Sequence, residues 1–235
     1  MRAPGYLGCA ALVVTLGGAE AGAQERPLDL AGLVARLDLT EKGAKRWLEQ
    51  LGVRGDSAAT ERLLAVSASS GASLLTREGG DSSVRIDPEL DTLLLRPETG
   101  IVLVHNHPAN VGLSSNDLRQ LTKPGVLAVV AIGHEGSVFV AAAGPRFDRE
   151  FFHERQYEGA RAEVLKKLRA EWPSSSLPVA VSDAHFSHLV TQALSRAGIV
   201  RYWFTLRGAG RESYEKARVV FTRVIFGAAG RLKNR

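Results

Sequence analysis

Residues 101–118 read IVLVHNHPANVGLSSNDL, and the rest of the chain is organised around this stretch. Residues 101–104 are an unbroken apolar run, which favours a buried strand, and the run leads into His105 and His107. Because alternate side chains of a strand point to the same face, both imidazoles are expected to face one way. Pro108 then ends the strand.

A helix start follows a short loop. Ser114-x-x-Asp117 precedes the apolar Leu118 and has the spacing of a capping box. The loop therefore brings a carboxylate close to the two histidines at the end of the strand. Two neutral imidazoles and one carboxylate, with a fourth position left for water, are the ligands expected of a catalytic zinc site. The sequence predicts Zn²⁺ bound by His105, His107 and Asp117.

Apolar patterning elsewhere predicts a sheet covered by helices. Residues 90–95 fit either a short helix or a strand. Further strands are expected at residues 62–66, 72–76, 83–86, 126–132, 137–142 and 199–206. Helices are expected at residues 30–37, 40–51, 118–121, 147–172 and 182–197, and from about residue 211 to the end. Strand, helix, strand and strand around the histidines predict an α/β fold of α-β-α layers with a mixed sheet.

The first 23 residues have the features of a secretory signal peptide. Arg2 is followed by an apolar stretch at residues 7–16 and by Ala21-Gly22-Ala23, a cleavage site that would leave Gln24 as the first residue. A short membrane anchor is the alternative, but the apolar stretch is well below the roughly 20 residues that a spanning helix needs. We expect an exported protein, either periplasmic or secreted.

Charge and sulfur are both unevenly distributed. The net charge is +5, and residues 211–235 hold seven Lys or Arg against two Glu. A basic C-terminal helix at 207–235 could contact an anionic surface or partner, but no nucleic acid is expected. Cleavage would remove the only cysteine, Cys9, which excludes disulfides and thiolate catalysis.

Hydrolysis at such a site also needs a base. Glu61, at the start of the 62–66 strand, can lie beside the histidine strand if the two pack in one sheet. Glu78 is the competing residue, although it belongs to a Gly-rich turn. A Glu at either position could take a proton from water and return it to a leaving group.

These residues together resemble a known family. Glu61, His105-x-His107-Pro108 and Ser114-x-x-Asp117 look like the signature of the JAMM (JAB/MPN) zinc metalloproteases, and most closely of their bacterial branch. The resemblance implies a JAMM/cytidine-deaminase-like core and a zinc isopeptidase site. It gives Glu61 the role of base and Ser114 the role of oxyanion donor. Six residues separate His107 from Ser114 where many members have seven, so Ser115 is an alternative hydroxyl.

The sequence patterns and the resemblance together suggest how the chain is divided. We expect a signal peptide at 1–23, a helical hairpin at 24–56, a JAMM-like metalloprotease domain at 57–206 with a helical insertion at 147–178, and the basic helix at 207–235. The expected activity is hydrolysis of an amide bond in a peptide or protein. A non-catalytic JAMM-fold binding module and another kind of zinc hydrolase remain as alternatives.

Four further histidines lie outside the motif. His185 and His188 are spaced i and i+3 on a predicted helix, so they could hold a second metal ion, although packing roles are more common at such positions. His134 is expected in a turn and His153 on a helix surface. The sequence specifies neither the substrate nor the oligomeric state.

Overall fold

A computed structural model describes residues 28–53, 60–80, 83–171 and 178–234. The expected signal peptide at 1–23 lies outside the described residues, as does most of the expected linker at 172–178. Within the described part of the chain, no helix combines the length and the apolar character needed to cross a membrane.

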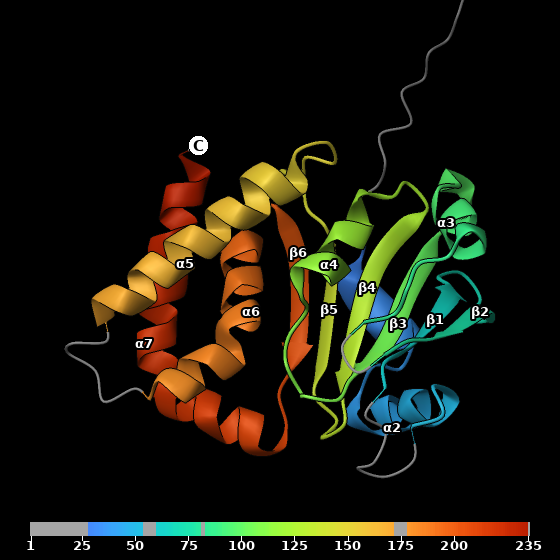
Figure 1. Ribbon diagram of the computed structural model, residues 1–235, viewed down its shortest axis with the longest axis horizontal. Coiled ribbons are helices and arrows are strands. Elements are labelled where there is room, and N and C mark those ends of the chain that lie inside the picture. The colour runs from blue at the N-terminus through green and yellow to red at the C-terminus, as the bar shows by residue number, and fades with distance from the viewer. Residues whose placement is uncertain (1–27, 54–59, 81–82, 172–177, 235) are drawn as a thin grey trace, which may run out of the picture.

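The described residues have a mixed α/β fold built on a six-stranded mixed sheet, as the sequence predicts (Figure 1). The strand order is β2-β1-β3-β4-β5-β6, in which β3 and β4 are parallel and all other neighbours are antiparallel. The strands are β1 (Arg62–Ser67), β2 (Ser73–Glu78), β3 (Ile101–His107), β4 (Val126–Gly133), β5 (Val138–Ala143) and β6 (Val200–Thr205).

Helices cover both faces of this sheet (Figure 1). The α-helices are α1 (Leu30–Arg36), α2 (Glu41–Gln50), α3 (Pro88–Leu94), α4 (Ser115–Arg119), α5 (Glu158–Glu171), α6 (Val179–Arg196) and α7 (Gly208–Lys233). Two 3₁₀ turns, η2 (Pro97–Thr99) and η3 (Gln120–Thr122), and a π-helical turn, η4 (Phe152–Tyr157), complete the described helices.

Strand β3 is central, and all seven of its residues are buried. Val102 and Val104 pack in the apolar cluster that includes α1 and α2, whereas Leu103 packs in the cluster that includes α4 to α7. Because side chains alternate along a strand, His105 and His107 lie on the same face as Leu103. The histidines therefore point towards the layer of α4.

One expected strand is absent. Residues 83–86 form no regular secondary structure and lead into α3. Asp87 caps this helix, with its side chain accepting a hydrogen bond from Leu90 N at 2.9 Å, and Pro88 occupies the first turn. The Asp-Pro pair is a helix-start signal, which resolves the ambiguity at residues 90–95 in favour of a helix and makes the expected strand at 83–86 wrong.

The helix expected at 147–172 starts later than predicted. Asp148 accepts hydrogen bonds from Glu150 N and Phe151 N, both at 3.1 Å, in a turn that precedes the helix. The chain then continues through the π-helical η4 into α5. Phe147 stacks on the fully buried Phe152 with ring centroids 4.7 Å apart, so this aromatic contact fixes the turn rather than a first helical turn.

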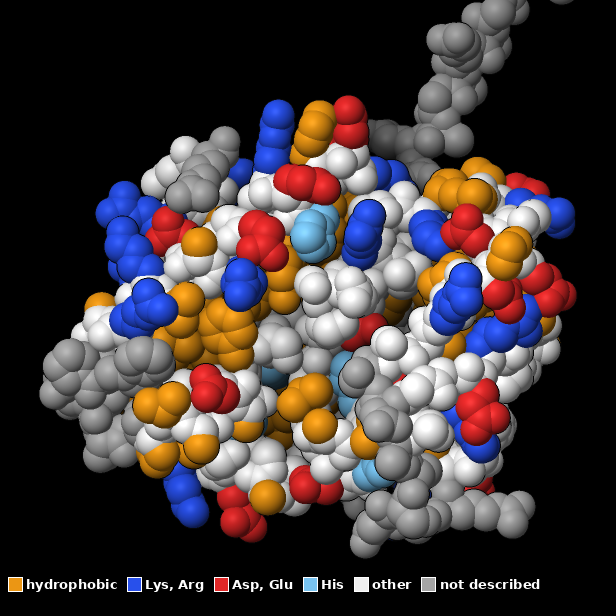
Figure 2. Space-filling view, in the orientation of Figure 1, with side chains coloured by type: hydrophobic (Ala, Val, Ile, Leu, Met, Phe, Trp, Pro, Cys, Tyr) orange, Lys and Arg blue, Asp and Glu red, His pale blue; other side chains and the backbone are white. Residues whose placement is uncertain are grey.

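The C-terminal helix is part of the core, not an appendage. Helix α7 buries Phe221, Val224 and Leu232 against the same cluster as α5 and α6. Its Lys and Arg side chains lie on the opposite, exposed side, and basic side chains gather over the α5 and α7 layer at the left of Figure 2. The basic residues of α7 noted in the sequence therefore lie on one side of this helix.

Candidate metal centre

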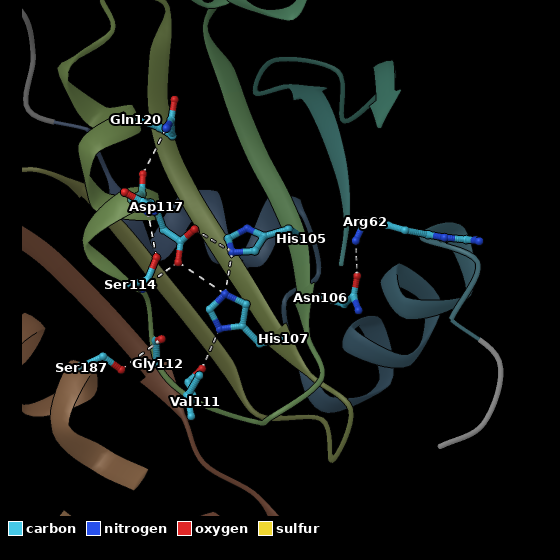
Figure 3. Close-up of polar contacts among 11 residues, drawn as sticks. Arg62, His105, Asn106, His107, Val111, Gly112, Ser114, Asp117, Gln120 and Ser187 are labelled. Atoms are coloured by element: carbon cyan, nitrogen blue, oxygen red, sulfur yellow. Dashed lines mark hydrogen bonds and ion pairs between the residues drawn. The ribbon is translucent and has the colours of Figure 1, made fainter. Parts of the chain in front are cut away.

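The end of β3 and the start of α4 bring three metal-ligating side chains together (Figure 3). His105 Nε2 lies 2.9 Å from His107 Nε2 and 3.2 Å from Asp117 Oδ1, and His107 Nε2 lies 3.4 Å from Asp117 Oδ2. Among the residues that the structure describes, these three form the one group of His, Cys, Asp or Glu side chains whose ligand atoms converge, all within 4.8 Å. The group could hold a metal ion.

The spacing of these atoms is compatible with one shared metal ion. Metal–nitrogen bonds of 2.0–2.1 Å in a tetrahedron place neighbouring ligand atoms about 3.3 Å apart. The three observed separations, 2.9, 3.2 and 3.4 Å, are close to this value, and the last two are measured to different oxygens of Asp117. Both histidines are only 4 % exposed, so water does not separate the ligands from one another.

The proton on His107 is fixed by the backbone. His107 Nδ1 lies 2.9 Å from the carbonyl oxygen of Val111, and because a carbonyl only accepts, Nδ1 must donate. In the neutral ring, Nε2 then carries the lone pair and faces Asp117. His105 has no equivalent bond, because its Nδ1 is buried without a hydrogen-bond partner among the described residues. The orientation of His105 depends on packing.

Asp117 is held by the start of its own helix. Ser114 N donates to Asp117 Oδ2 at 2.7 Å, and Asp117 N donates to Ser114 Oγ at 3.2 Å, which completes a capping box. Helix α4 has only five residues and would not be stable alone, so this cap and the buried Leu118 are needed to keep it folded. The capping motif therefore also fixes a metal ligand.

Charge compensation stabilises the ionised form of Asp117. Burial alone would raise the pKa of the carboxyl group, but the neighbouring His105 and His107 outweigh it and hold the pKa well below its usual range. Burial also acts on His107, where it lowers the pKa, but Asp117 and the Val111 carbonyl raise it by more. The result is a carboxylate that stays ionised in a buried position, as a metal ligand must.

The loop between the ligands is braced from two sides. Asn110 adopts a positive φ of 53°, which asparagine tolerates, and its side chain accepts a hydrogen bond from Glu135 N at 2.9 Å. Gly112 lies against α6, where Ser187 Oγ donates to its carbonyl at 3.2 Å, and an added Cβ would come 3.0 Å from His188 Cβ. Helix α6 therefore supports the loop that carries the Val111 carbonyl.

Glu61 lies in the same cleft as the three ligands. Burial raises the pKa of its carboxyl group, an effect that electrostatic interaction with the nearby His107 and His105 only partly offsets. A raised pKa suits a carboxylate that must both accept and release a proton. Glu78 is 64 % exposed, forms an ion pair with Arg62 at 2.8 Å, and is not among the residues that line the cleft.

The cleft has a volume of about 660 Å³ and an uneven lining. Apolar side chains, among them Leu63, Val84 and Ile86, form one part of the wall, and Arg119 and Lys123 lie in another. Figure 2 shows the hollow near the middle of this face, with acidic and histidine side chains visible inside it. The cleft is large enough for several residues of an extended peptide.

Ser114 lines the cleft, whereas Ser115 does not. The Ser114 hydroxyl accepts the capping bond from Asp117 N, so its own hydrogen is free to be donated elsewhere. Ser115 forms a hydrogen bond with Tyr157, whose own pKa is raised mainly by burial. Of the two hydroxyls considered from the sequence, Ser114 is the one placed beside the ligands.

The second histidine pair is arranged differently. His188 Nδ1 lies 2.8 Å from Tyr202 Oη and its Nε2 lies 2.9 Å from Gln192 Nε2, while His185 Nε2 lies 2.8 Å from Ser213 Oγ. Burial lowers the pKa of His188 to about 3. These nitrogens are engaged with neutral groups, which supports the packing role.

The other two histidines lie close to where they were expected. His134 is in the turn between β4 and β5, and its Nε2 lies 3.1 Å from Asn106 Nδ2. His153 lies in η4, partly buried rather than on the surface, and stacks on Tyr157.

Sequence reasoning overlooked Asn106, the Val111 carbonyl and the support from α6. The alternation of a strand could have flagged Asn106, because a residue between two ligands must face the opposite side of the sheet. The other two contacts depend on a loop conformation and on a long-range packing contact, which no local pattern encodes. No family model matches this chain, and no curated protein or solved structure shows significant similarity to it.

Proposed function

We propose that this chain is a zinc-dependent metallopeptidase of the JAMM type, which hydrolyses an amide or isopeptide bond. His105, His107 and Asp117 would hold Zn²⁺, Glu61 would act as the base, and Ser114 would stabilise the oxyanion. The observation that supports this most is that Glu61 and Ser114 lie in the same cleft as the three ligands. The parallel β3 and β4, joined through α4, are compatible with the JAMM/cytidine-deaminase-like core that we include in the proposal.

Each side chain then has a distinct task. Zinc, when bound, supplies a Lewis acid that polarises the scissile carbonyl and lowers the pKa of a water molecule towards about 7. Glu61 takes the proton from the attacking water and returns it to the departing amine, which its raised pKa favours. Ser114 donates its free hydroxyl hydrogen to the developing oxyanion.

The proposed substrate is a peptide or protein that enters the cleft in an extended conformation. The apolar wall near Leu63, Val84 and Ile86 would take an apolar side chain. We further propose that the substrate is met outside the cytoplasm, in agreement with the signal peptide expected from the sequence.

Substitution of Glu61 tests the assigned chemistry. Glu61→Gln is expected to lower turnover of a fluorogenic peptide library by about 10²- to 10⁴-fold while retaining stoichiometric zinc in elemental analysis, because the side chain is a base and not a ligand. Glu78→Gln is the matched control and should retain both. Loss of zinc in Glu61→Gln would contradict the role of Glu61, and zinc binding without turnover in the parent protein would favour a binding module.

A further inference from the structure

Asn106 lies between two candidate ligands and faces away from them. It is fully buried, and its side chain points to the side of β3 opposite the imidazoles of His105 and His107 (Figure 3). Neither the metal ligation nor the proton transfers described above use it. Its hydrogen bonds nevertheless hold the residues on either side of Glu61, the proposed base.

The carboxamide of Asn106 binds the backbone on both sides of Glu61. Its Oδ1 accepts a hydrogen bond from Arg62 N at 2.7 Å, and its Nδ2 donates to the carbonyl of Thr60 at 3.1 Å. In an extended strand, the carbonyl of one residue and the N–H of the second residue along point to the same side. One amide therefore bridges both groups, as a peptide unit of a neighbouring strand would.

The other side of Glu61 is bound as well. Glu61 N donates to the carbonyl of Gly80 and Gly79 N donates to the carbonyl of Glu61, both at 2.8 Å. Strand β1 pairs with β3 as far as Leu63, which lies opposite His105. Before Leu63, the side-chain amide of Asn106 takes the place of this pairing by binding Thr60 and Arg62. The backbone of Glu61 is thus fixed from both sides, and strand alternation places its side chain on the face of Leu63 and His105.

We propose that Asn106 is a positioning residue, whose carboxamide clamps Thr60 and Arg62 and so holds the Glu61 carboxylate towards the metal site. This inference rests on the proposed function of Glu61. Asparagine suits the position because its carboxamide combines an acceptor and a donor. Aspartate would keep the bond from Arg62 N but present a second acceptor to the Thr60 carbonyl, and alanine would make neither bond.

Three readouts test the clamp in Asn106→Ala. Amide hydrogen exchange at Arg62, followed by NMR, should accelerate at least about tenfold, since its acceptor is removed. The zinc-induced shift of the Glu61 carboxyl carbon resonance, assigned with Glu61→Gln, should fall to less than about half. Stoichiometric zinc binding should remain, because no ligand changes.

Measurements of turnover test whether Asn106 acts through Glu61. Asn106→Ala should lower kcat on the peptide library about 100-fold in the parent protein, the order of magnitude of a 1 Å misplacement, but less than about twofold in Glu61→Gln, where the base is already absent. Ser137→Ala is the matched control, because it removes a different buried acceptor, for Arg207 N at 2.9 Å, and should leave zinc binding, Glu61 and kcat unchanged.

These experiments distinguish failure of the role proposed for Asn106 from failure of the proposed function. Equal loss of turnover in both backgrounds, loss of zinc, or an unchanged Glu61 resonance would overturn the clamp. If the parent protein hydrolyses no peptide, the proposed function fails, and exchange at Arg62 together with the Glu61 resonance still decides whether Asn106 positions this carboxylate. If Asn106→Ala does not fold, Asn106→Asp should show a partial loss of the zinc-induced shift with Arg62 still protected, and an undiminished shift would overturn the clamp.

Discussion

The described part of the chain has two buried histidine pairs, one on β3 and one on α6, and among these residues only the first pair points its nitrogens at a carboxylate. His105 and His107 converge with Asp117, whereas His185 and His188 bond to hydroxyl and amide groups. Both spacings place two imidazoles on one face of an element. The difference teaches that the spacing of histidines nominates a site, and that the groups facing them decide whether it can bind a cation.

The largest expected difference between the pairs is in metal binding. His107→Ala should abolish stoichiometric zinc binding, because two protein ligands remain where a catalytic site uses three. His188→Gln should retain it, since both nitrogens of His188 face neutral partners. Elemental analysis after dialysis against a weak chelator measures both variants. Retention of zinc in His107→Ala, or its loss in His188→Gln, would contradict the assignment.

The second expected effect is on the stability of the metal-free protein in acid. The unfolded chain protonates His188 near pH 6.5 and the folded chain only near pH 3, so the unfolded state binds more protons between these values. His188 should therefore reduce the free energy of unfolding by up to about 1.4 kcal/mol for each pH unit as the pH falls through this window.

Urea unfolding at a series of pH values measures this effect. Because His188→Gln does not titrate, its stability should fall less steeply than that of the parent protein between pH 6.5 and 3. Parallel curves for the two proteins would show that His188 is not held neutral by burial.

The smallest expected effect concerns the packing of the metal-site loop against His188 of the second histidine pair. In Gly112→Ala, the new Cβ would lie 3.0 Å from His188 Cβ, so the loop must move by a few tenths of an ångström and carry the Val111 carbonyl away from His107. Zinc affinity should fall about tenfold, the low end for a change outside the ligands themselves. Gly210→Ala, whose Cβ would meet nothing within 4 Å, is the control. An unchanged zinc affinity in Gly112→Ala would show that contact with α6 does not position the Val111 carbonyl for His107.

The sequence predicted the parts of the site that depend on local pattern. Strand alternation placed His105 and His107 on one face, and the capping spacing placed Asp117 at a helix start, because both are set within a few residues. The class of the fold followed from the order of the apolar segments. Glu61 was nominated with an alternative, because its position depends on how β1 pairs with β3.

Other features could not be predicted because tertiary contacts decide them. The stack of Phe147 on Phe152 delays the start of a helix that the apolar pattern extends to residue 147. Residues 83–86 have strand-like composition but form no strand, and Ser83, Val84 and Ile86 line a cleft instead. The charge pattern predicted a basic C-terminal helix, but it did not show that one side of α7 is buried in the core. In each case the neighbour that decides the structure lies outside the local pattern.

The most direct test of the central claim is the location of zinc in a crystal of the protein grown with the metal, by anomalous scattering at the zinc edge. We expect one strong peak about 2.0–2.2 Å from His105 Nε2, His107 Nε2 and a carboxylate oxygen of Asp117. A peak at His185 and His188, or none at the end of β3, would contradict it.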